Sequence, residues 1–542
     1  MADSRFPDNQ GLEAEKFGSK LEDHQIESIH DEIQRVNIQE LSNRAITWRS
    51  KAALRLLVVI VIQGLSVAAF AIDGNIIGGM SALPAFREHF KVSTSGSAIA
   101  LVLAAMSIGN IVASLFQWLS DLIGRRGVTF IGNIILVVSC ILQATAPNRA
   151  VMIVGRVFSG VGCSLSATVG PLYMSEVAPS AHRGLAVGLY CSCYSIGSIV
   201  IACVLLGGSY MEGNWTWRMP MLFQLAPPVI VSALVYPCTP ESPRYLIYKG
   251  KVNEAKHVIA KYHTDSGLVS DPIVAAEISQ IQASIESVDS TPWDFTTLWS
   301  KKSARYRLKV IFMYAFFQQC NGTSMLAYYL PGILSLVGIT NTQQQLGINV
   351  GMSVTSWLST LVGSVIVDRV RRRFLLMATM GVFIFFLAMM SLTGGLFDNG
   401  IAMRAMGILT ITWIYLFQIS NGLLSNALHN IYPNEVLHYS QRAKGMGIYS
   451  FFQNCFGLVM TYGMGEALAK IEWKLTGSGV LKIYFIFIGI DSVCLYLTWR
   501  YFPEFQHLSL EEIDHIFETP GVHPVKISKA LHPRSKTANN NA

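Results

Sequence analysis

Long apolar runs recur along the whole chain, and they constrain its fold more than any other feature. A helix that crosses a bilayer needs about 20 mostly apolar residues, and in lipid only helices or closed barrels satisfy their own backbone polar groups. The 542 residues have a mean hydropathy of +0.40 and only 14% are charged, which is typical of a multi-pass membrane protein. Twelve helical spans are predicted, near residues 54–77, 97–118, 127–146, 150–174, 185–207, 219–238, 309–336, 346–367, 374–395, 404–430, 443–467 and 480–500.

Basic residues gather in alternate loops, which predicts how the helices are oriented. The pair Arg125-Arg126, the segment 249–309 and the segment 369–373 fall in one set of loops, whereas the opposite set holds few basic residues. The positive-inside rule places the basic set in the cytosol, together with both termini. The formal net charge of +7 therefore reflects membrane topology and gives no indication of nucleic-acid binding. No signal-peptide core precedes the first span, which we expect to act as the insertion signal.

Three polar signals occur twice in the same order, roughly 250–260 residues apart. The pairs are Asp121–Arg126 with Asp368–Arg373, Glu176/Arg183 with Glu435/Arg442, and Pro240-Glu241 with Pro503-Glu504. A repeat of this kind predicts two six-helix halves related by an axis along the membrane normal, with a solute site between them, as in secondary transporters.

The repeated charges lie at the ends of predicted helices. Gly124 permits a tight turn at the first of these ends, and the charges can form networks between neighbouring helices that hold one conformation and release in another. The alternative for any single arginine is a contact with lipid headgroups. We predict a gating role for Asp121, Arg125, Glu176, Arg183, Asp368, Arg372, Glu435 and Arg442.

One carboxylate stands alone in the first predicted span. Asp73 is the only charged residue between Leu56 and Phe86. A charge at the centre of a bilayer costs roughly 3 kcal/mol on insertion scales, so such residues usually face a water-filled cavity and carry function. The alternative is a structural hydrogen bond to a neighbouring helix; we favour the functional interpretation.

Arg156 is the only charge between Ala150 and Ser175, one to two turns into the fourth predicted span. A cation that approaches a buried carboxylate favours its ionised form, and desolvation without that cation favours the neutral form. If Arg156 moves during a conformational cycle, Asp73 gains and loses one proton per cycle. A proton gradient would then be the energy source, with no cofactor. A static ion pair is the alternative.

Amide and hydroxyl side chains recur on the seventh predicted span. At spacings of three, three and four they would line one helical face. They are Gln318, Asn321, Ser324 and Tyr328, with Gln319 beside them; Asn430 and Gln453 could contribute from later spans. Carboxamides both donate and accept hydrogen bonds, which matches sugar hydroxyls, and no charge occurs from Val310 to Thr340, which predicts a neutral solute. Polar contacts between helices are the alternative.

The chain is predicted to contain five segments. They are a cytosolic N-terminal segment (1–50), an N-terminal six-helix half (51–238), a cytosolic central loop (239–307), a C-terminal six-helix half (308–502) and a cytosolic tail (503–542). Asp271-Pro272 is typical of a helix start, and apolar residues follow it at helical spacing, so we expect short helices in the central loop.

Other reactive residues show no pattern of chemistry. The nine cysteines fall in or beside predicted spans, so no disulfide framework is expected, and no Cys/His spacing suits a metal. No nucleophile–base set or phosphate-binding loop indicates an enzyme. Gly155, Ser159 and Cys163 are small residues at four-residue spacing, which predicts close helix packing.

The motifs resemble those of the sugar porter family of the major facilitator superfamily over roughly residues 50–520. They are Asp121–Arg126, Gly155-Arg156, Pro171–Glu176, Arg183-Gly184, Pro240–Arg244, Gln318-Gln319 with Tyr328-Tyr329, and Leu508–Ile513. Within the family, Asp73–Leu83, Gly188–Ile199 and Asn430–Glu435 are similar to the fungal lactose permease-like branch, which includes lactose and cellobiose carriers. The resemblance implies the major facilitator fold, and it implies that Asp73 and Arg156 are the proton-coupling pair.

Some positions depart from the family pattern. Cys191 stands where an amide is usual, Ser324 stands where asparagine is usual, and Asn430 occupies the place of a tryptophan. These three departures weaken an assignment to ordinary glucose. Arg371 replaces the turn glycine of the second half, and Pro503–His507 departs from the usual motif after the last span; these two positions concern gating.

The expected function is a proton-coupled symporter that imports a neutral saccharide, with a disaccharide or glycoside favoured, by alternating access. The alternatives are a transporter of a non-sugar natural product with the same fold and, less favoured, a sensor that binds a sugar without transporting it. The expected partners are the solute, protons and membrane lipid. We expect a monomer in the plasma membrane.

Overall fold

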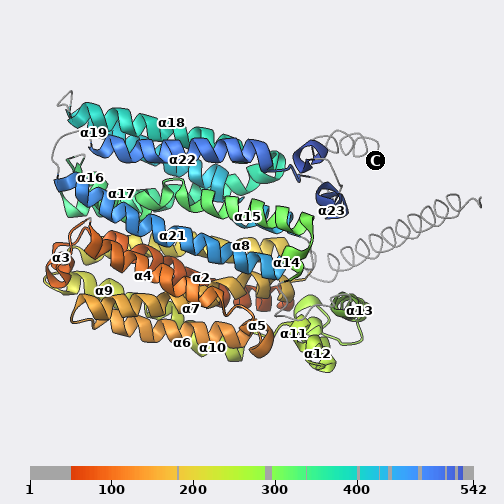
Figure 1. Cartoon of the computed structure of the whole chain (residues 1–542). Coiled ribbons are helices and arrows are strands. Elements are labelled where there is room, and N and C mark those ends of the chain that lie inside the picture. The colour runs from red at the N-terminus through yellow and green to blue at the C-terminus, as the bar shows by residue number, and fades with distance from the viewer. Residues whose placement is uncertain are drawn as a thin grey trace, which may run out of the picture. The chain divides into compact units, whose positions relative to one another are not determined.

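The structure is a computed structural model in which every regular element is helical within the described residues (Figure 1). It describes residues 50–94, 96–179, 182–286, 296–336, 338–398, 403–426, 428–437, 442–473, 479–506, 510–518 and 523–528. Apart from Ser50, the predicted N-terminal segment lies outside them. Residue contacts divide the chain into two compact units, of which the first comprises 1–60, 173–188 and 240–287 and the second comprises 61–172, 189–239 and 288–542.

The helices before the central segment contain the first six predicted spans. They are α2 (Lys51–Met80), α3 (Pro84–Phe90), α4 (Ser97–Ser114), α5 (Leu119–Ile123), α6 (Arg125–Ala144), α7 (Arg149–Val177), α8 (Arg183–Gly208), α9 (Trp215–Phe223) and α10 (Ala226–Cys238). The sixth span is divided between α9 and α10 because Pro227 and Pro228 have no N–H groups for the helical hydrogen-bond ladder.

The remaining helices begin with four short ones. They are α11 (Pro243–Tyr248), α12 (Val252–His263), α13 (Pro272–Glu286) and α14 (Thr297–Ser300). The longer helices of the second half follow. They are α15 (Lys302–Cys320), α16 (Thr323–Leu336), α17 (Thr342–Arg369), α18 (Arg372–Asp398), α19 (Met403–Ser420), the π-helix η1 (Asn421–Asn426), α20 (Leu428–Val436), α21 (Arg442–Trp473), α22 (Gly479–Tyr501) and α23 (Leu510–Glu518).

Within the described residues, nine helices are long and apolar enough to cross a membrane. They coincide with the first to sixth and the eighth to tenth predicted spans. The other three predicted spans coincide with α15 and α16, with α21 and with α22. The tenth span continues beyond its predicted end, through η1 and α20 to Val436.

The seventh predicted span is not one helix. α15 ends at Cys320, and Gly322 has a φ of +82°, a left-handed conformation that favours glycine. Asn321 accepts the N–H of Thr323 at 3.1 Å and the Thr323 hydroxyl at 2.7 Å, so it caps the start of α16. The prediction that polar residues on this span share one continuous helical face is therefore wrong, because the break changes the direction of the side chains that follow it.

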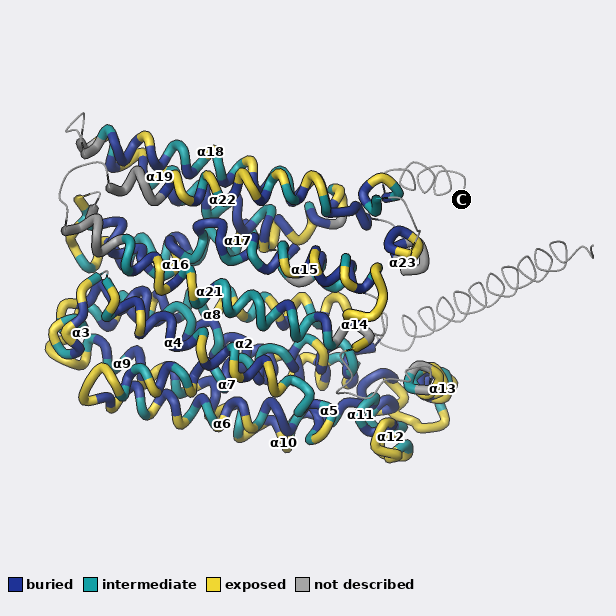
Figure 2. The backbone as a smooth tube through the Cα atoms, viewed as in Figure 1, coloured by how far each residue is buried: buried dark blue, intermediate teal, exposed yellow. Residues whose placement is uncertain are grey.

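Large apolar residues are exposed at many positions of the spanning helices, and Figure 2 shows exposed positions in yellow among the buried ones along these helices. On α22, for example, Phe485 is 61% exposed and Ile486 is 59% exposed, whereas Phe487 is only 2% exposed. Extended exposed apolar faces are unfavourable in water and favourable in lipid. One face of α22 is thus suited to lipid and the opposite face is packed against protein.

Close contacts between backbones hold neighbouring helices together in the second unit. α4 and α7 approach so closely that a Cβ atom added to Gly109 would lie 2.1 Å from the carbonyl oxygen of Val157. Small residues permit such an approach, which is a common way of packing helices in membranes. In the second half α18 and α22 lie side by side along their lengths (Figure 1).

The short helices α11, α12 and α13 form a small core in the first unit. Apolar residues from all three pack together, among them Leu246, Ile259 and Ile278. The predicted helix start is confirmed, because the Asp271 carboxylate accepts the N–H of Ile273 at 3.4 Å just before α13. These helices bury their apolar faces against one another, as amphipathic helices must.

A buried histidine–carboxylate pair lies in the same unit. His263 on α12 contacts the Glu277 carboxylate on α13 through Nδ1 at 2.5 Å and the carbonyl of Val177 through Nε2 at 2.9 Å. Burial by itself lowers the pKa of His263, but the charge of Glu277 and the two hydrogen bonds outweigh burial and raise it above its ordinary value. Since both ring nitrogens face acceptors, the imidazolium form fits this site.

Candidate proton and solute site

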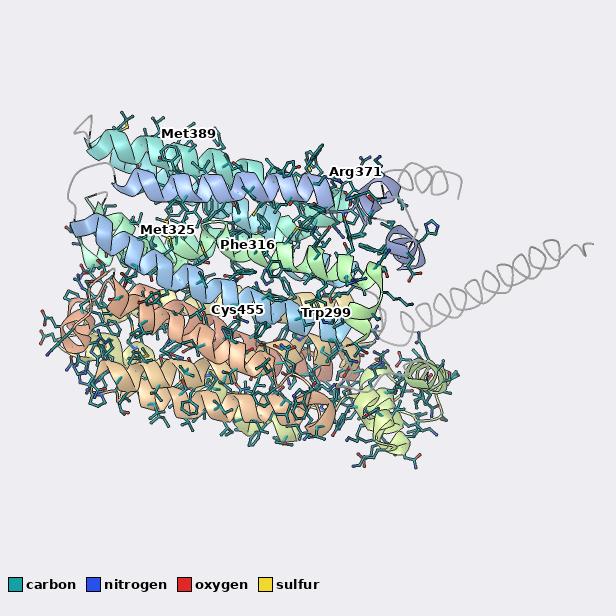
Figure 3. The ribbon with its side chains drawn as sticks, in the orientation of Figure 1. Trp299, Phe316, Met325, Arg371, Met389 and Cys455 are labelled. Atoms are coloured by element: carbon teal, nitrogen blue, oxygen red, sulfur yellow. The ribbon has the colours of Figure 1, made fainter. Side chains whose placement is uncertain are left out.

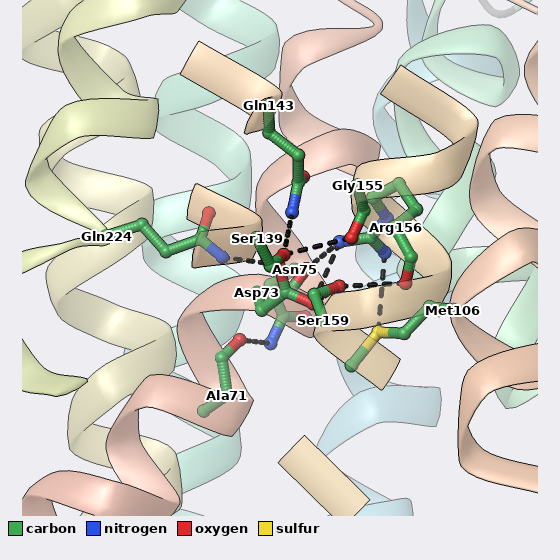
Figure 4. A network of polar contacts seen from close by, with 10 residues as sticks. All are labelled: Ala71, Asp73, Asn75, Met106, Ser139, Gln143, Gly155, Arg156, Ser159 and Gln224. Atoms are coloured by element: carbon green, nitrogen blue, oxygen red, sulfur yellow. Dashed lines mark hydrogen bonds and ion pairs between the residues drawn. The ribbon is translucent and has the colours of Figure 1, made fainter. Parts of the chain in front are cut away.

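Asp73 lies in the middle of α2 and is completely buried. Its Oδ2 atom is 3.0 Å from Nη1 of Arg156 on α7, and the same Nη1 atom donates to the Asp73 backbone carbonyl at 2.8 Å (Figure 4). The arginine is itself only 1% exposed. The structure thus brings together the two charges that the sequence places alone in the first and fourth spans.

Two further side chains complete the surroundings of the Asp73 carboxylate (Figure 4). Ser159 donates its hydroxyl to Oδ2 at 2.7 Å, and the side-chain amide of Gln224 donates to Oδ1. One cation and two neutral donors therefore stabilise the ionised carboxylate. Sequence reasoning assigned Ser159 to helix packing, which is incomplete, and it missed Gln224. A lone amide in the sixth span was the signal that could have identified Gln224.

A second layer of polar contacts surrounds this pair. Asn75 donates to the Ala71 carbonyl at 2.7 Å and to the Ser198 hydroxyl at 3.2 Å. Ser139 donates to the carbonyl of Gly155, next to the arginine, at 2.9 Å. Within the described residues, Nε of Arg156 has no hydrogen-bond partner although it is buried. Nη1 of Arg156 is thus bound to Asp73, whereas its Nε–H group has no acceptor within the described residues.

The helix that carries Asp73 also contacts the broken seventh span. A Cβ atom added to Gly78 on α2 would lie 2.9 Å from the carbonyl oxygen of Ala327 on α16. The next residue, Tyr328, lies within electrostatic range of both Asp73 and Arg156. A small pocket at this contact is lined by Gly78, Gly79, Ala327, Leu330, Pro331, Gln345, Leu346 and Asn349.

The predicted solute residues fall into two groups. Gln318 is 8% exposed and donates to the Tyr314 hydroxyl at 2.7 Å, while Asn321 is 1% exposed and caps α16. Polar atoms of both side chains make hydrogen bonds within the protein. Gln319, Ser324 and Tyr328 are only partly buried, which leaves them more accessible to a solute.

Later spans supply part of the predicted set. The Gln319 amide lies beside α21, where a Cβ atom on Gly457 would be 3.3 Å from its oxygen. On the same helix, the Gln453 amide nitrogen is 3.3 Å from Nε2 of His429. The side chain of Asn430 lies outside the part of the chain that the structure describes. Gln319 and Gln453 are thus placed by α15 and α21, which pack against each other.

The first two residues predicted to gate, Asp121 and Arg125, form an ion pair, and their gating role stays a prediction. Asp121 and Arg125 are 3.1 Å apart across the turn at Gly124, which has a φ of +87°. Arg125 also donates to the carbonyl of Ser120 at 3.1 Å. The next arginine, Arg126, donates to the carbonyl of Tyr236 near the end of α10 at 2.9 Å. This turn is therefore tied to the last helix of its half.

The second half repeats these contacts at equivalent positions. Arg372 donates to the carbonyl of Val367, five residues before it, as Arg125 does to Ser120. Arg373 donates to the carbonyl of Trp499 near the end of α22, as Arg126 does to Tyr236. Tyr236 and Trp499 each precede their Pro-Glu motif by four residues. The internal repeat is thus present in the individual hydrogen bonds.

Two carboxylates, Glu435 and Glu504, lie at the corresponding turn of the second half. Glu435 lies 3.4 Å from Arg372; the side chains of Arg442, its expected partner, and of Asp368 lie outside the described residues. Glu504, which lies in the repeated Pro-Glu motif but was not among the named gating residues, accepts the backbone N–H groups of Arg372 at 2.9 Å and Arg373 at 3.0 Å. It therefore caps the start of α18, beside Arg371 (Figure 3).

The remaining predicted gate residues lie in the first unit. Glu176, at the end of α7, accepts a hydrogen bond from the Ser242 hydroxyl at 2.5 Å, and Ser242 begins α11. Arg183, at the start of α8, acts electrostatically on His263. The gating role of these residues stays a prediction.

The chain is similar to known transporters over most of its length. The family described as "Sugar (and other) transporter" matches residues 57–517. Myo-inositol transporter 3C of Cryptococcus neoformans is 28% identical over 466 residues, which cover 83% of this chain and 76% of that protein. The galactose-proton symporter of Escherichia coli K12 is 26% identical over 479 residues, which cover 88% of this chain and 95% of that protein.

The fold is shown by a solved structure. The inward-open structure of the xylose transporter XylE from E. coli aligns with a TM-score of 0.69 over 85% of this chain and 100% of that chain, at 18% identity. The predicted all-α architecture of two six-helix halves is confirmed, and so is the prediction of a transporter in place of an enzyme. The chain is a multi-pass membrane protein of the major facilitator fold, and it belongs to the sugar transporter family.

Proposed function

We propose that the protein is a symporter that imports a neutral saccharide together with a proton by alternating access. The observation that carries the proposal is the environment of Asp73, a completely buried carboxylate 3.0 Å from the buried Arg156. An ionisable pair of this kind is costly to bury inside a membrane domain, so pairs that occur there usually serve a function. Proton coupling gives it one, because the carboxylate is the group that can bind and release a proton.

The coupling step is a change of partners at Asp73. Arg156, Ser159 and Gln224 all donate to the carboxylate, an arrangement that suits its ionised form. If Arg156 withdraws, the buried carboxylate loses its counter-charge, and the neutral protonated form is favoured. The partly unpartnered guanidinium of Arg156 lowers the cost of that withdrawal, because one of its N–H groups has no hydrogen bond to lose within the described residues.

The solute step is joined to the proton step through α2 and α16. Their backbones touch at Gly78, and Tyr328 lies near both members of the ion pair. A solute that contacts Tyr328, Ser324 and Gln319 would therefore act on a helix that packs against the Asp73 helix. Movement of either helix changes the environment of the other, which is the link that symport requires.

The solute is proposed to be polyhydroxylated and uncharged. Amide and hydroxyl groups of Gln319, Ser324, Tyr328 and Gln453 both donate and accept, as sugar hydroxyls do. The resemblance to the lactose permease-like branch favours a disaccharide or glycoside. The two relatives described above are named for myo-inositol and galactose, so smaller cyclic polyols and hexoses belong in the same test.

The test is proton uptake by yeast cells that lack their own sugar carriers. Cells that express the full chain should make the medium alkaline when the correct solute is added, from a panel of lactose, cellobiose, maltose, galactose and myo-inositol. Asp73→Asn should abolish that response. Glu254→Gln is the matched control, since Glu254 is an exposed carboxylate on α12. Solute uptake without proton movement would contradict symport, and silence for every sugar from surface-expressed protein would favour a non-sugar natural product.

The proposed setting is the plasma membrane, with both termini in the cytosol and the protein acting as a monomer. The distribution of basic residues between alternate loops supports this orientation. Accessibility of terminal epitope tags before and after cell permeabilisation tests it directly.

A further inference from the structure

A second carboxylate is completely buried in the other half of the protein. Asp491 lies in the middle of α22 and is 0% exposed. Neither of its carboxylate oxygens has a hydrogen-bond partner within the described residues. It therefore differs from Asp73, whose two oxygens are contacted by one cation and two neutral donors.

The elements that pack against α22 bring no counter-charge to Asp491. The main neighbour is α18, which carries no charged residue between Arg373 and Asp398, and α15 carries none after Lys309. On α21 there is none between Lys444 and Glu466, and on α22 itself Asp491 is the only one between Lys482 and Arg500. Within the described residues, the titratable groups that interact electrostatically with it are two thiols, Cys320 on α15 and Cys494 on α22.

An ionised carboxylate without a counter-charge is very unfavourable in such a place. The cost of burying an unpaired ion far exceeds the cost of burying a neutral acid, so the group takes up a proton instead. Phe487, one turn before Asp491 on the same face of α22, is apolar and belongs to the buried core. The neutral acid is the form that these surroundings permit.

The break in the seventh span lies beside Phe487, the apolar neighbour of Asp491 on α22. A Cβ atom added to Gly322 would lie 3.6 Å from Leu387 and 3.6 Å from Phe487. Gly322 separates α15 from α16 and has a left-handed φ of +82°. A change of direction at this break would separate Gly322 from Phe487 and admit water toward the carboxyl group.

We propose that Asp491 is a second proton-binding site, which holds its proton while the contact of Gly322 with Leu387 and Phe487 stays closed and releases it when that contact opens. The ligand is a proton, and the site belongs to the C-terminal half, apart from the Asp73–Arg156 pair. The proposal does not depend on the proposed symport, because a bound proton can be detected without any solute.

Infrared spectroscopy of the purified full-length protein tests the site. The carbonyl stretch of a protonated carboxylic acid is separate from the bands of an ionised carboxylate, so a wild-type minus Asp491→Asn difference spectrum identifies the form that is present. We expect the variant to lose one protonated-acid band at neutral pH, far above the pH of about 3.9 at which an aspartate in water ionises. Loss of carboxylate intensity instead would overturn the proposal. If Asp491→Asn does not fold, Asp491→Glu should shift the same acid band.

The role of Phe487 is tested with a matched pair of phenylalanines on α22. Phe487→Ala should replace the acid band at neutral pH by carboxylate bands, because water reaches Asp491; Phe487→Leu serves if the alanine variant does not fold. Phe485→Ala, at a site that is 61% exposed, should leave the acid band unchanged. An acid band that survives in Phe487→Ala would overturn the release step, and one that disappears in Phe485→Ala would show that the loss is not specific to Phe487. Proton uptake with Asp73→Asn is a separate readout, so the two proposals can fail independently.

Discussion

The two halves of this protein agree at the ends of their helices and differ at their centres. At the ends, Arg126 and Arg373 donate to equivalent carbonyls of the last helix in each half. At the centres, Asp73 is surrounded by donors, whereas Asp491 has no hydrogen-bond partner among the described residues. The shared contacts join α6 to α10 in the first half and α18 to α22 in the second. The different centres indicate that the halves treat a buried carboxylate in two ways, one by pairing it and the other by keeping it neutral.

The largest expected effect comes from removing Arg156, the cation that pairs with Asp73 in the N-terminal half. Arg156→Gln removes the counter-charge of Asp73, so the buried carboxylate must either stay ionised without a partner or take up a proton, and the free energy of unfolding should fall by about 3–5 kcal/mol. Thermal unfolding of the detergent-solubilised protein measures this loss. The double variant Asp73→Asn/Arg156→Gln should recover much of it, since no unpaired charge remains. Losses that simply add would mean that the pair does not interact and would remove the contrast between the two centres.

The cap that Glu504 forms at the start of α18 is a helix-end contact whose strength can be measured. Glu504→Ala removes the acceptor for the N–H groups of Arg372 and Arg373, which should cost about 1.5–3 kcal/mol of stability because the acceptor is charged and buried. The measurement is again thermal unfolding. Glu518→Ala, which changes an exposed carboxylate on α23, is the matched control. Equal effects of the two substitutions would argue against a specific cap.

The buried pair of His263 and Glu277, in the first unit, shows how a pair outside the spanning helices should respond to pH. The pKa of His263 is raised by Glu277 and by its hydrogen bonds, against the effect of burial. A raised pKa in the folded state stabilises the fold below the ordinary histidine pKa of about 6.5, and this contribution is lost as the pH rises through the folded value. Hydrogen exchange of α12 and α13, corrected for the intrinsic rate, should show weaker protection at higher pH. His263→Gln should remove that dependence, and a dependence that persists would refute the assignment.

The smallest expected effect is at Asp491, the buried carboxylate in the middle of α22. If Asp491 is protonated, Asp491→Asn replaces one neutral polar group by another of nearly the same shape, and the free energy of unfolding should change by less than about 1 kcal/mol. Thermal unfolding of this variant beside Arg156→Gln compares the two centres under one set of conditions. A loss as large as that of Arg156→Gln would show that Asp491 is ionised and partnered, and the comparison between the halves would fail.

Much of the site follows from single charges in apolar runs. Asp73 and Arg156 are each the only charge in a long apolar stretch, and the structure places them 3.0 Å apart. Asp491 carries the same signal in the twelfth span, between Lys482 and Arg500. The rule that intramembrane charges mark functional sites applies to both carboxylates, but it does not tell which of them has a partner.

The solute residues show where helical periodicity fails. A regular spacing predicts one face for Gln318, Asn321 and Ser324, but Gly322 interrupts the helix between them. A glycine within an apolar span is compatible with a continuous helix or with a break. The outcome depends on what packs around it, and here Leu387 and Phe487 pack against the break.

The sequence by itself determined the spanning helices, the two repeated halves and the pair of charges in the first and fourth spans, because hydropathy and charge act along the chain over about 20 residues at a time. Only the tertiary structure decided that Gln224 and Ser159 complete the site of Asp73, that Glu504 caps α18, and that Asp491 has no hydrogen-bond partner among the described residues. These outcomes join residues that lie far apart in the sequence. They depend on which helix faces meet, and that is settled by the packing of the whole bundle.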